Sequence, residues 1–192
     1  EMSVQSSGAM LWVVEQPTRP NAVINSGAST TFTIEVTAPN NAQAGDSGPS
    51  ITPIITSTRS GMTFMGLEFN ELEVEAIEDI ILRLIDSPTK LIPGAANKIV
   101  IEIENNGNGP TQAIVDLPNL PETWQWWIRV ADQNHTGPID LSASYDLQDI
   151  KVVEIWILIS MTETAGILHS IEITASLFAE GIDINPLDNI IE

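Results

Sequence analysis

The chain has 192 residues, 43% of them hydrophobic, and its 26 acidic and 7 basic side chains give a net charge of −19. This apolar content excludes a disordered chain, and the length allows one large folded domain or two small ones. The acidic surplus excludes nucleic-acid binding and repels anionic membranes, while the absence of cysteine excludes disulfides, thiol nucleophiles and cysteine-bound zinc.

The longest apolar stretches have the length of strands, far below the roughly 20 residues that cross a bilayer. We therefore expect no membrane insertion. The chain opens Glu-Met-Ser-Val without a basic and apolar leader, and we interpret it as a processed or excised piece of a longer protein.

Alternating apolar residues predict β-strands in the first part of the chain. Phe32, Ile34 and Val36 share one face of a first strand, and a second strand is expected from Ile51 to Thr58. Pro53 lies inside this second strand and cannot donate a backbone hydrogen bond, so it predicts an edge position.

Residues 71–86, ELEVEAIEDIILRLID, fit two different patterns. Their isoleucines and leucines match the apolar stripe of a helix, whereas the alternation of Glu71, Glu73 and Glu75 with apolar residues matches a strand. The β-branched residues favour two strands that meet near Glu78, the last of one domain and the first of the next.

Four further strands are expected in the second part of the chain, with inner rows made mostly of isoleucine. They span residues 98–104, 124–130, 152–160 and 169–177. Turn clusters rich in Gly, Asn and Pro separate them, including NNGNGP at 105–110 and NHTGP at 134–138. Many short strands at this spacing without intervening helices predict a β-sandwich.

An internal repeat relates the two parts of the chain. Residues 32–61 can be laid over residues 154–181, with Ala44-Gly45 matching Ala165-Gly166 between two alternating strands. The repeat predicts two domains, residues 1–78 and 79–192, of which the first lacks the equivalent of Ile80 through the NNGNG turn. An unpaired sheet edge is then expected in the first domain, to be closed by a second copy as a homodimer, by strands borrowed from residues 2–9 or from a neighbour, or left as a frayed remnant.

Residues 93–124 resemble the immunoglobulin-like modules of prokaryotic, including archaeal, cell-surface proteins of the cell-adhesion-related (CARDB) type, and related modules appended to secreted glycosidases. The resemblance lies in Pro93-Gly94, in the turn Asn106-Gly107-Asn108 and in Leu120-Pro121-Glu122-Thr123-Trp124; VTAPNNAQAGD at 36–46 matches a second recurrent piece. It implies an all-β fold of tandem immunoglobulin-like β-sandwiches, the first incomplete, with no catalytic residue to carry over.

This resemblance leads us to expect a non-catalytic structural or adhesion module, located outside the cell or on its surface, whose partners are neighbouring domains of the parent protein. The alternative is a carbohydrate-binding accessory module of a secreted hydrolase. Trp124 and Trp126 are expected in the core, whereas Trp127, Trp156 and Leu158 share the outward face and form a candidate binding surface, unless another part of the protein covers them.

Calcium is the one ion that the sequence favours, because acidic turns can supply its six to eight oxygen ligands. The first candidate set is Asp183, Asn185, Asp188 and Asn189, although turn formation at Pro186 is the simpler explanation. The second set is Glu75, Glu78 and Asp79 at the domain boundary, where an ion would stiffen a stalk.

Other chemical possibilities have weaker support in the sequence. Asn134 begins one Asn-His-Thr sequon for N-glycosylation. A triad of Ser142, His169 and Asp146 can be assembled on paper, but no local motif accompanies it, and we expect no enzyme activity.

Overall fold

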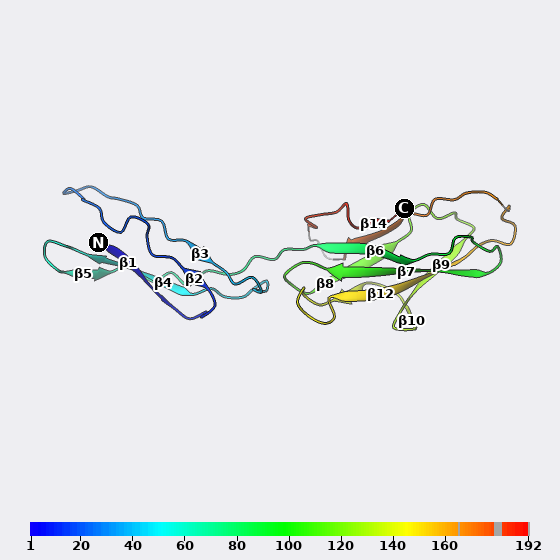
Figure 1. Ribbon diagram of the computed structural model, residues 1–192, viewed down its shortest axis with the longest axis horizontal. Coiled ribbons are helices and arrows are strands. Elements are labelled where there is room, and N and C mark those ends of the chain that lie inside the picture. The colour runs from blue at the N-terminus through cyan, green and yellow to red at the C-terminus, as the bar shows by residue number, and fades with distance from the viewer. Residues whose placement is uncertain (165, 179–181, 192) are drawn as a thin grey trace. The chain divides into compact units, whose positions relative to one another are not determined.

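The computed structural model describes residues 1–164, 166–178 and 182–191 (Figure 1). The fold is all-β, as predicted: the described residues form antiparallel sheets and contain no helix. The chain divides into two compact units, Glu1–Glu75 and Ala76–Glu192, just before the boundary expected at residue 78. No helix of the described residues is long and apolar enough to cross a membrane.

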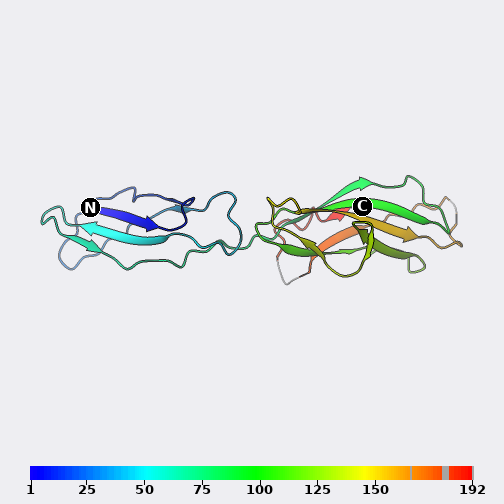
Figure 2. The ribbon, with the colours of Figure 1, turned by 90° about the horizontal axis from the view of Figure 1, so that it is seen from below.

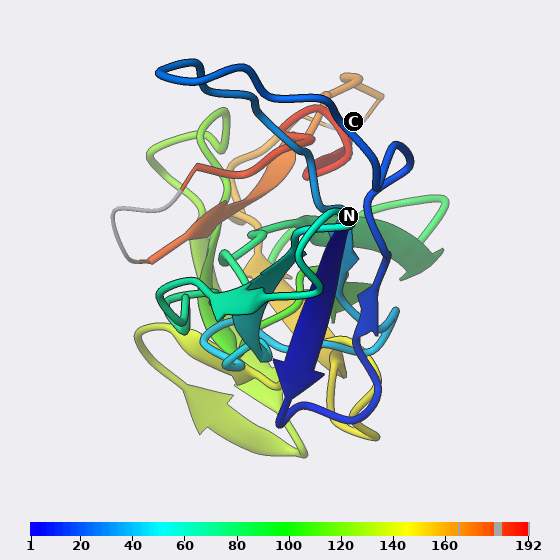
Figure 3. The ribbon, with the colours of Figure 1, turned by 90° about the vertical axis from the view of Figure 1, so that its left-hand side faces the viewer.

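The first unit contains two small sheets, which Figure 2 shows from below. A three-stranded antiparallel sheet has the order β1-β4-β5, and β2 pairs with β3 separately. The strands are β1 (Met2–Ser7), β2 (Val13–Val14), β3 (Val36–Thr37), β4 (Ser50–Thr56) and β5 (Thr63–Met65). Figure 3 looks along this unit from its end, where the N-terminus leads directly into the dark blue β1.

The core of the first unit is small. Its buried apolar residues are Met2, Val4, Ala42 and Ile51, together with Pro17 and Pro49. The row Phe32, Ile34 and Val36 is only half-buried, and many large apolar side chains of this unit are exposed, among them Leu11 and Phe64. The strand predicted over this row is wrong in extent, because only Val36–Thr37 joins a ladder. Beyond this pair, Glu15 N donates to Glu35 O at 2.9 Å, but residues 32–35 form no ladder.

Pro53 does not lie on an edge strand, contrary to the prediction, because β4 is the middle strand of its sheet. The Pro53 carbonyl accepts a hydrogen bond from Gly66 N at 2.8 Å, just past the end of β5. The exposed Gly66 carbonyl can bind water in place of the missing proline N–H. On the other side, the amide of Gln16 satisfies both backbone groups of Val4, which lies opposite Pro53.

The second unit is a β-sandwich of two antiparallel sheets. The larger sheet has the order β10-β9-β12-β7-β6, and the smaller one has the order β11-β8-β13-β14. The larger comprises β6 (Ile80–Asp86), β7 (Ala96–Asn105), β9 (Gln125–Val130), β10 (Gln133–His135) and β12 (Ile150–Leu158). The smaller comprises β8 (Thr111–Asp116), β11 (Ile139–Leu141), β13 (Ile173–Leu177) and β14 (Ile190–Ile191).

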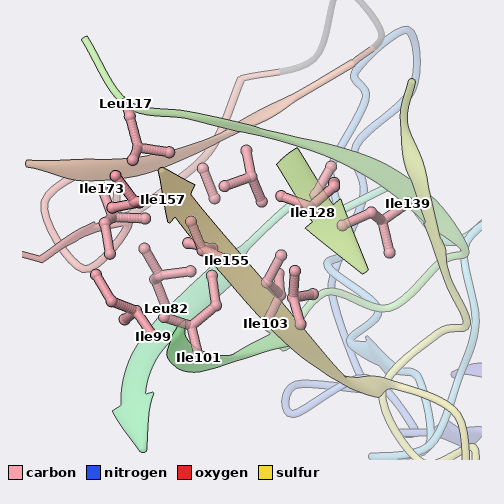
Figure 4. Packing of buried hydrophobic residues seen from close by; sticks show 14 of the residues in the cluster. Leu82, Ile99, Ile101, Ile103, Leu117, Ile128, Ile139, Ile155, Ile157 and Ile173 are labelled. Atoms are coloured by element: carbon pink, nitrogen blue, oxygen red, sulfur yellow. The ribbon is translucent and has the colours of Figure 1, made fainter. Parts of the chain in front are cut away.

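The core of the second unit lies between these sheets (Figure 4). The predicted inner rows are confirmed in both central strands of the larger sheet, since Ile99, Ile101 and Ile103 of β7 and Val153, Ile155 and Ile157 of β12 are buried. Ile173 and Ala175 of β13 approach them from the opposite sheet. Trp124 is also buried, as expected, and Trp126 packs against the same cluster.

Residues 71–86 contain no helix, so the strand interpretation holds for β6. The first half of this range is an exception, because residues 71–77 form no continuous strand. Residues 72–74 run beside residues 45–48 through separate hydrogen bonds, such as Gly48 N to Leu72 O at 2.7 Å and Val74 N to Asp46 O at 2.9 Å. Ile77 N instead donates to Asn108 Oδ1 at 2.7 Å.

The turn expected at residues 134–138 is found over residues 136–138, between β10 and β11, where Gly137 has a φ of 90°. A further turn, which was not predicted, lies just before β10. Val130 pairs with Gln133, so that Ala131 and Asp132 form the two-residue turn of the β9–β10 hairpin. Both have positive φ values, 49° and 62°, as a type I′ turn requires. Neither residue is the Asn or Gly that such turns favour, which is why the sequence did not reveal the hairpin.

Candidate functional site

Three aspartates from distant parts of the second unit form one acidic cluster. Asp79 immediately precedes β6, while Asp183 and Asp188 lie in the segment between β13 and β14. One oxygen of each lies within 4.8 Å of the others. Asp79 is only 2% exposed, so the cluster is set against the interior rather than on an open surface.

Hydrogen bonds hold the carboxylates of Asp79 and Asp183 in place. Asp183 Oδ2 accepts from the backbone N of Ile80 at 3.2 Å and from Asn189 Nδ2 at 2.9 Å. Asp183 Oδ1 accepts from the backbone N of Asn185 at 2.8 Å. Asp79 Oδ2 accepts from Asn106 Nδ2 at 2.6 Å. The NNGNGP turn therefore reaches the cluster, a contact that sequence spacing did not indicate.

Three buried oxygens of the cluster have no hydrogen-bond partner among the residues that the structure describes: Asp79 Oδ1, Asp188 Oδ1 and Asn189 Oδ1. A buried acceptor without a donor costs about 1–3 kcal/mol, and more when it is charged. Burial, and then the charges of Asp79 and Asp183, raise the pKa of the Asp188 carboxyl above its ordinary value. The site therefore presents oxygen atoms that favour a positively charged partner.

The two calcium sets predicted from the sequence meet in part at this cluster. Asp79 comes from the boundary set, and Asp183 and Asp188 come from the C-terminal set. Glu78 and Asn185 contact the cluster segments through backbone groups. The Glu78 carbonyl accepts a hydrogen bond from Ile184 N at 3.0 Å, and the Asn185 N–H donates to Asp183 Oδ1. Glu75 belongs to the first unit.

The aromatic surface lies on the outer face of the larger sheet. Trp127 of β9 and Trp156 of β12 are directly cross-strand neighbours, and their rings stack with centroids 6.3 Å apart and planes within 6°. Both side chains are half-buried, as is Leu158 two residues further along β12. The predicted outward parity of Trp127 and Trp156 is thus borne out, with intermediate exposure rather than an open platform.

Charged groups border this tryptophan pair. Glu154 accepts from Lys98 Nζ at 2.9 Å and from Trp156 Nε1 at 3.1 Å, and the Arg129 guanidinium lies 3.6 Å from it. Lys98 Nζ also lies 5.9 Å from the centroid of the Trp156 ring. The hydrogen bond from Lys98, more than that from Trp156, lowers the pKa of Glu154.

A third feature of the second unit is a hollow of about 670 Å³ at one end of the sandwich, lined mainly by aliphatic side chains and also by Trp124, Glu163 and His169. Glu163 uses one oxygen to accept from Trp124 Nε1 at 3.1 Å and faces His169 Nε2 with the other at 3.2 Å. The hydrogen bond from Trp124 is the main cause of a lowered pKa at Glu163.

The triad assembled on paper does not form around His169, whose ring contacts Glu163 and Trp124, while Ser142 lines a different, smaller hollow. Asn134 lies in β10 with an exposed side chain, so the sequon asparagine is accessible for modification.

Comparisons of the chain with protein-family models, with curated proteins and with solved structures found no match. The function of the chain must therefore be inferred from the geometry of its own residues.

Proposed function

We propose that this chain is a non-catalytic structural and adhesion module from the extracellular part of a prokaryotic surface protein, built from immunoglobulin-like sandwiches. The strand order of the second unit supports this fold. In immunoglobulin domains strands A, B, E and D form one sheet in the order ABED, and C, F and G form the other. Here β6-β7-β12-β9 and β8-β13-β14 follow these orders, with β10 and β11 added at the edges.

The first unit follows the later part of the same order. Its β1-β4-β5 sheet corresponds to β8-β13-β14, and its β2–β3 pair corresponds to β9–β12. Gly45 and Gly166, matched by the repeat, have φ values of 83° and 89°. Within residues 1–75, all of which are described, nothing corresponds to β6 and β7. The partners proposed for the open edge of β3 are a neighbouring domain or a second copy of the chain.

A structural module of this kind has to resist pulling forces, which is a load-bearing role. The observation that supports this role is the way the two ends of the second unit are joined. The segment entering β6 and the segment leading to β14 lie side by side, with a parallel bridge between Glu78 and Asp183. Ile184 N donates to Glu78 O and Leu82 N donates to Asp188 O, both at 3.0 Å. Tension on the two ends of parallel segments loads these bonds in shear, so several must break together.

Single-molecule stretching tests this role. We expect the second unit, pulled through its two ends, to resist force and then unfold in one step that releases about 40 nm of chain. The control applies force through cysteines placed at the exposed positions Asn119 and Asp132, the only thiols in an otherwise cysteine-free chain. A load-bearing role requires a higher unfolding force through the chain ends than through this control pair. Equal forces would contradict it.

A dimer through the β3 edge would fit an assembly role. The molar mass measured by light scattering gives the answer: twice the chain mass of 20.8 kDa supports pairing of two copies. A monomer leaves a neighbouring domain of the parent protein as the partner.

Carbohydrate binding is a second candidate function, because the nearly parallel Trp127 and Trp156 rings border charged side chains, and aromatic faces can stack on sugar rings. Titration with soluble oligosaccharides, followed by tryptophan fluorescence, tests this candidate. Trp127→Ala and Trp156→Ala should each abolish the response, whereas Tyr145→Ala, at an exposed aromatic residue elsewhere in the unit, should retain it. A response that survives both tryptophan changes would exclude this surface.

A further inference from the structure

We infer that Asp79, Asp183, Asp188 and Asn189 form a binding site for one calcium ion inside the second unit. This inference concerns ion binding and does not depend on the proposed load-bearing role. It joins one residue of the predicted boundary set, Asp79, to the predicted C-terminal set in a single site made only of second-unit residues.

Asn189 provides the observation that is independent of the acidic residues. Its side chain is neutral and only 4% exposed, and its Nδ2 donates to Asp183 Oδ2 at 2.9 Å. Its Oδ1 is nevertheless buried without a donor in the described part of the chain, like Asp79 Oδ1 and Asp188 Oδ1. Folded proteins satisfy the large majority of buried polar atoms, and a bound ion is one of the ordinary explanations for those left over. A cation at this position would satisfy all three oxygens together.

The chemistry of the ligands selects calcium among common divalent cations. All the candidate ligands are oxygen atoms, which hard cations prefer, and no histidine belongs to the cluster. Oxygens that share a calcium ion at about 2.3–2.6 Å lie within about 5 Å of one another. The carboxylate oxygens here lie within 4.8 Å of one another, so they need to move little. Water molecules would complete the six to eight ligands.

Among the described residues, no positively charged side chain forms an ion pair with the cluster that could replace a bound cation. Arg83, the cation that acts on Asp188, forms its ion pair with Glu104 on the adjacent strand β7. A proton shared between two carboxylates is the competing explanation, since burial and like charges raise the pKa of Asp188. A single proton, however, satisfies at most two of the three unpartnered oxygens.

The position of the site indicates what the ion would do. Asp79 lies at the start of β6, and Asp183 and Asp188 lie on the segment that hydrogen-bonds to Glu78 and Leu82. A calcium ion would therefore tie the first strand of the unit to its C-terminal segment across the same bonds. Calcium binding should then raise the stability of the second unit and protect the amides of residues 182–191.

The test uses the full chain freed of metal by EDTA and then titrated with calcium chloride. Isothermal titration calorimetry should show one site per chain, and saturating calcium should raise the Tm of the second unit by about 4 °C or more. Magnesium at the same concentration should produce a much smaller shift, because its rigid octahedral shell suits this mixed site poorly. Hydrogen exchange of residues 182–191 should slow with calcium and recover with EDTA.

Asp188→Asn is the informative variant, because it removes one charge and supplies a donor to the unpartnered oxygens. It should fold with equal or greater stability without metal and lose the calcium-induced shift in Tm. Asp86→Asn removes one charge from an exposed position at the end of β6 and should keep the full shift. If the two variants respond equally, calcium acts on overall charge and the site is excluded. No heat and no change in exchange for the unmodified chain would also overturn the inference and leave the shared proton as the explanation.

Discussion

At the scale of single residues, Trp124 combines a core position with one polar contact. Its side chain is 5% exposed, and its ring lies 4.9 Å from that of His169 while Nε1 donates to Glu163. Alternation predicted the buried position from the sequence. The polar partner lies 39 residues away along the chain and was not predicted, because it depends on the path of the loop after β12.

Trp124→Ala should lower the free energy of unfolding of the second unit by about 3–5 kcal/mol, since it removes a large buried ring and leaves a cavity. Urea denaturation followed by circular dichroism measures this change. Trp124→Phe keeps most of the packing and should cost less. An unchanged midpoint for the alanine variant would show that Trp124 does not belong to the core.

The lowered pKa of Glu163 predicts a specific pH dependence. The carboxylate is stabilised in the folded state, chiefly by the hydrogen bond from Trp124, so its stabilisation is present above the ordinary pKa of 4.5. It is lost as the pH falls below that value through the folded pKa. Thermal melts between pH 6 and 3 should show that Glu163→Gln loses less stability on acidification than the unmodified chain. Glu122→Gln, at an exposed position, should follow the unmodified chain instead.

At the scale of elements, the two-residue periodicity located β6, β7, β9, β12 and β13 of the second unit, but it revealed neither β8, β10, β11 and β14 nor the strand ends and neighbours. The rows of β7 and β12 are buried as the alternation predicts, because both strands lie in the middle of a sheet that is covered on one face. In the first unit the same pattern over residues 32–36 yields almost no ladder. Alternation marks a face that can be buried, whereas hydrogen-bond partners decide where a strand begins and ends.

The β9–β10 hairpin offers a test of turn chemistry. Ala131 and Asp132 both adopt left-handed backbone angles, which cost about 1 kcal/mol in a residue with an ordinary side chain. Ala131→Asn with Asp132→Gly places the favoured type I′ pair in the turn and should stabilise the second unit by about 1 kcal/mol. Thermal denaturation measures the gain. The reversed order, Ala131→Gly with Asp132→Asn, should stabilise less, and a loss of stability with Asn-Gly would contradict the assigned turn.

At the scale of the whole molecule, the internal repeat relates a well-packed unit to a sparsely packed one. The second unit has an extensive core of buried apolar residues, whereas the first buries few: Met2, Val4, Ala42, Ile51 and two prolines, Pro17 and Pro49. The difference matches the two strands that the first unit does not have, because β6 and β7 supply Ile80, Leu82 and three isoleucines to the second core. A matching hairpin should therefore improve the packing of the first unit.

This expectation can be tested by placing a copy of residues 79–110 directly before Glu1. In the second unit these residues form β6 and β7 and lead into β8, the counterpart of β1. Hydrogen exchange at residues 32–37 should slow, and the first unit should melt at a higher temperature. The same fusion with Ile99, Ile101 and Ile103 replaced by Asn is the matched control. If both fusions leave exchange and melting unchanged, the β3 edge does not bind a further strand.

Sequence alone determined the all-β class and the buried rows of the second unit, because side-chain alternation and turn composition are local properties of the chain. Only the tertiary structure decided the sheet orders and the acidic cluster. Asp79 and Asp183 belong to segments that a hydrogen bond joins across 103 residues, from Ile80 to Asp183. Their meeting depends on the first and last strands of one sandwich lying side by side, and no local pattern in the chain encodes that distance.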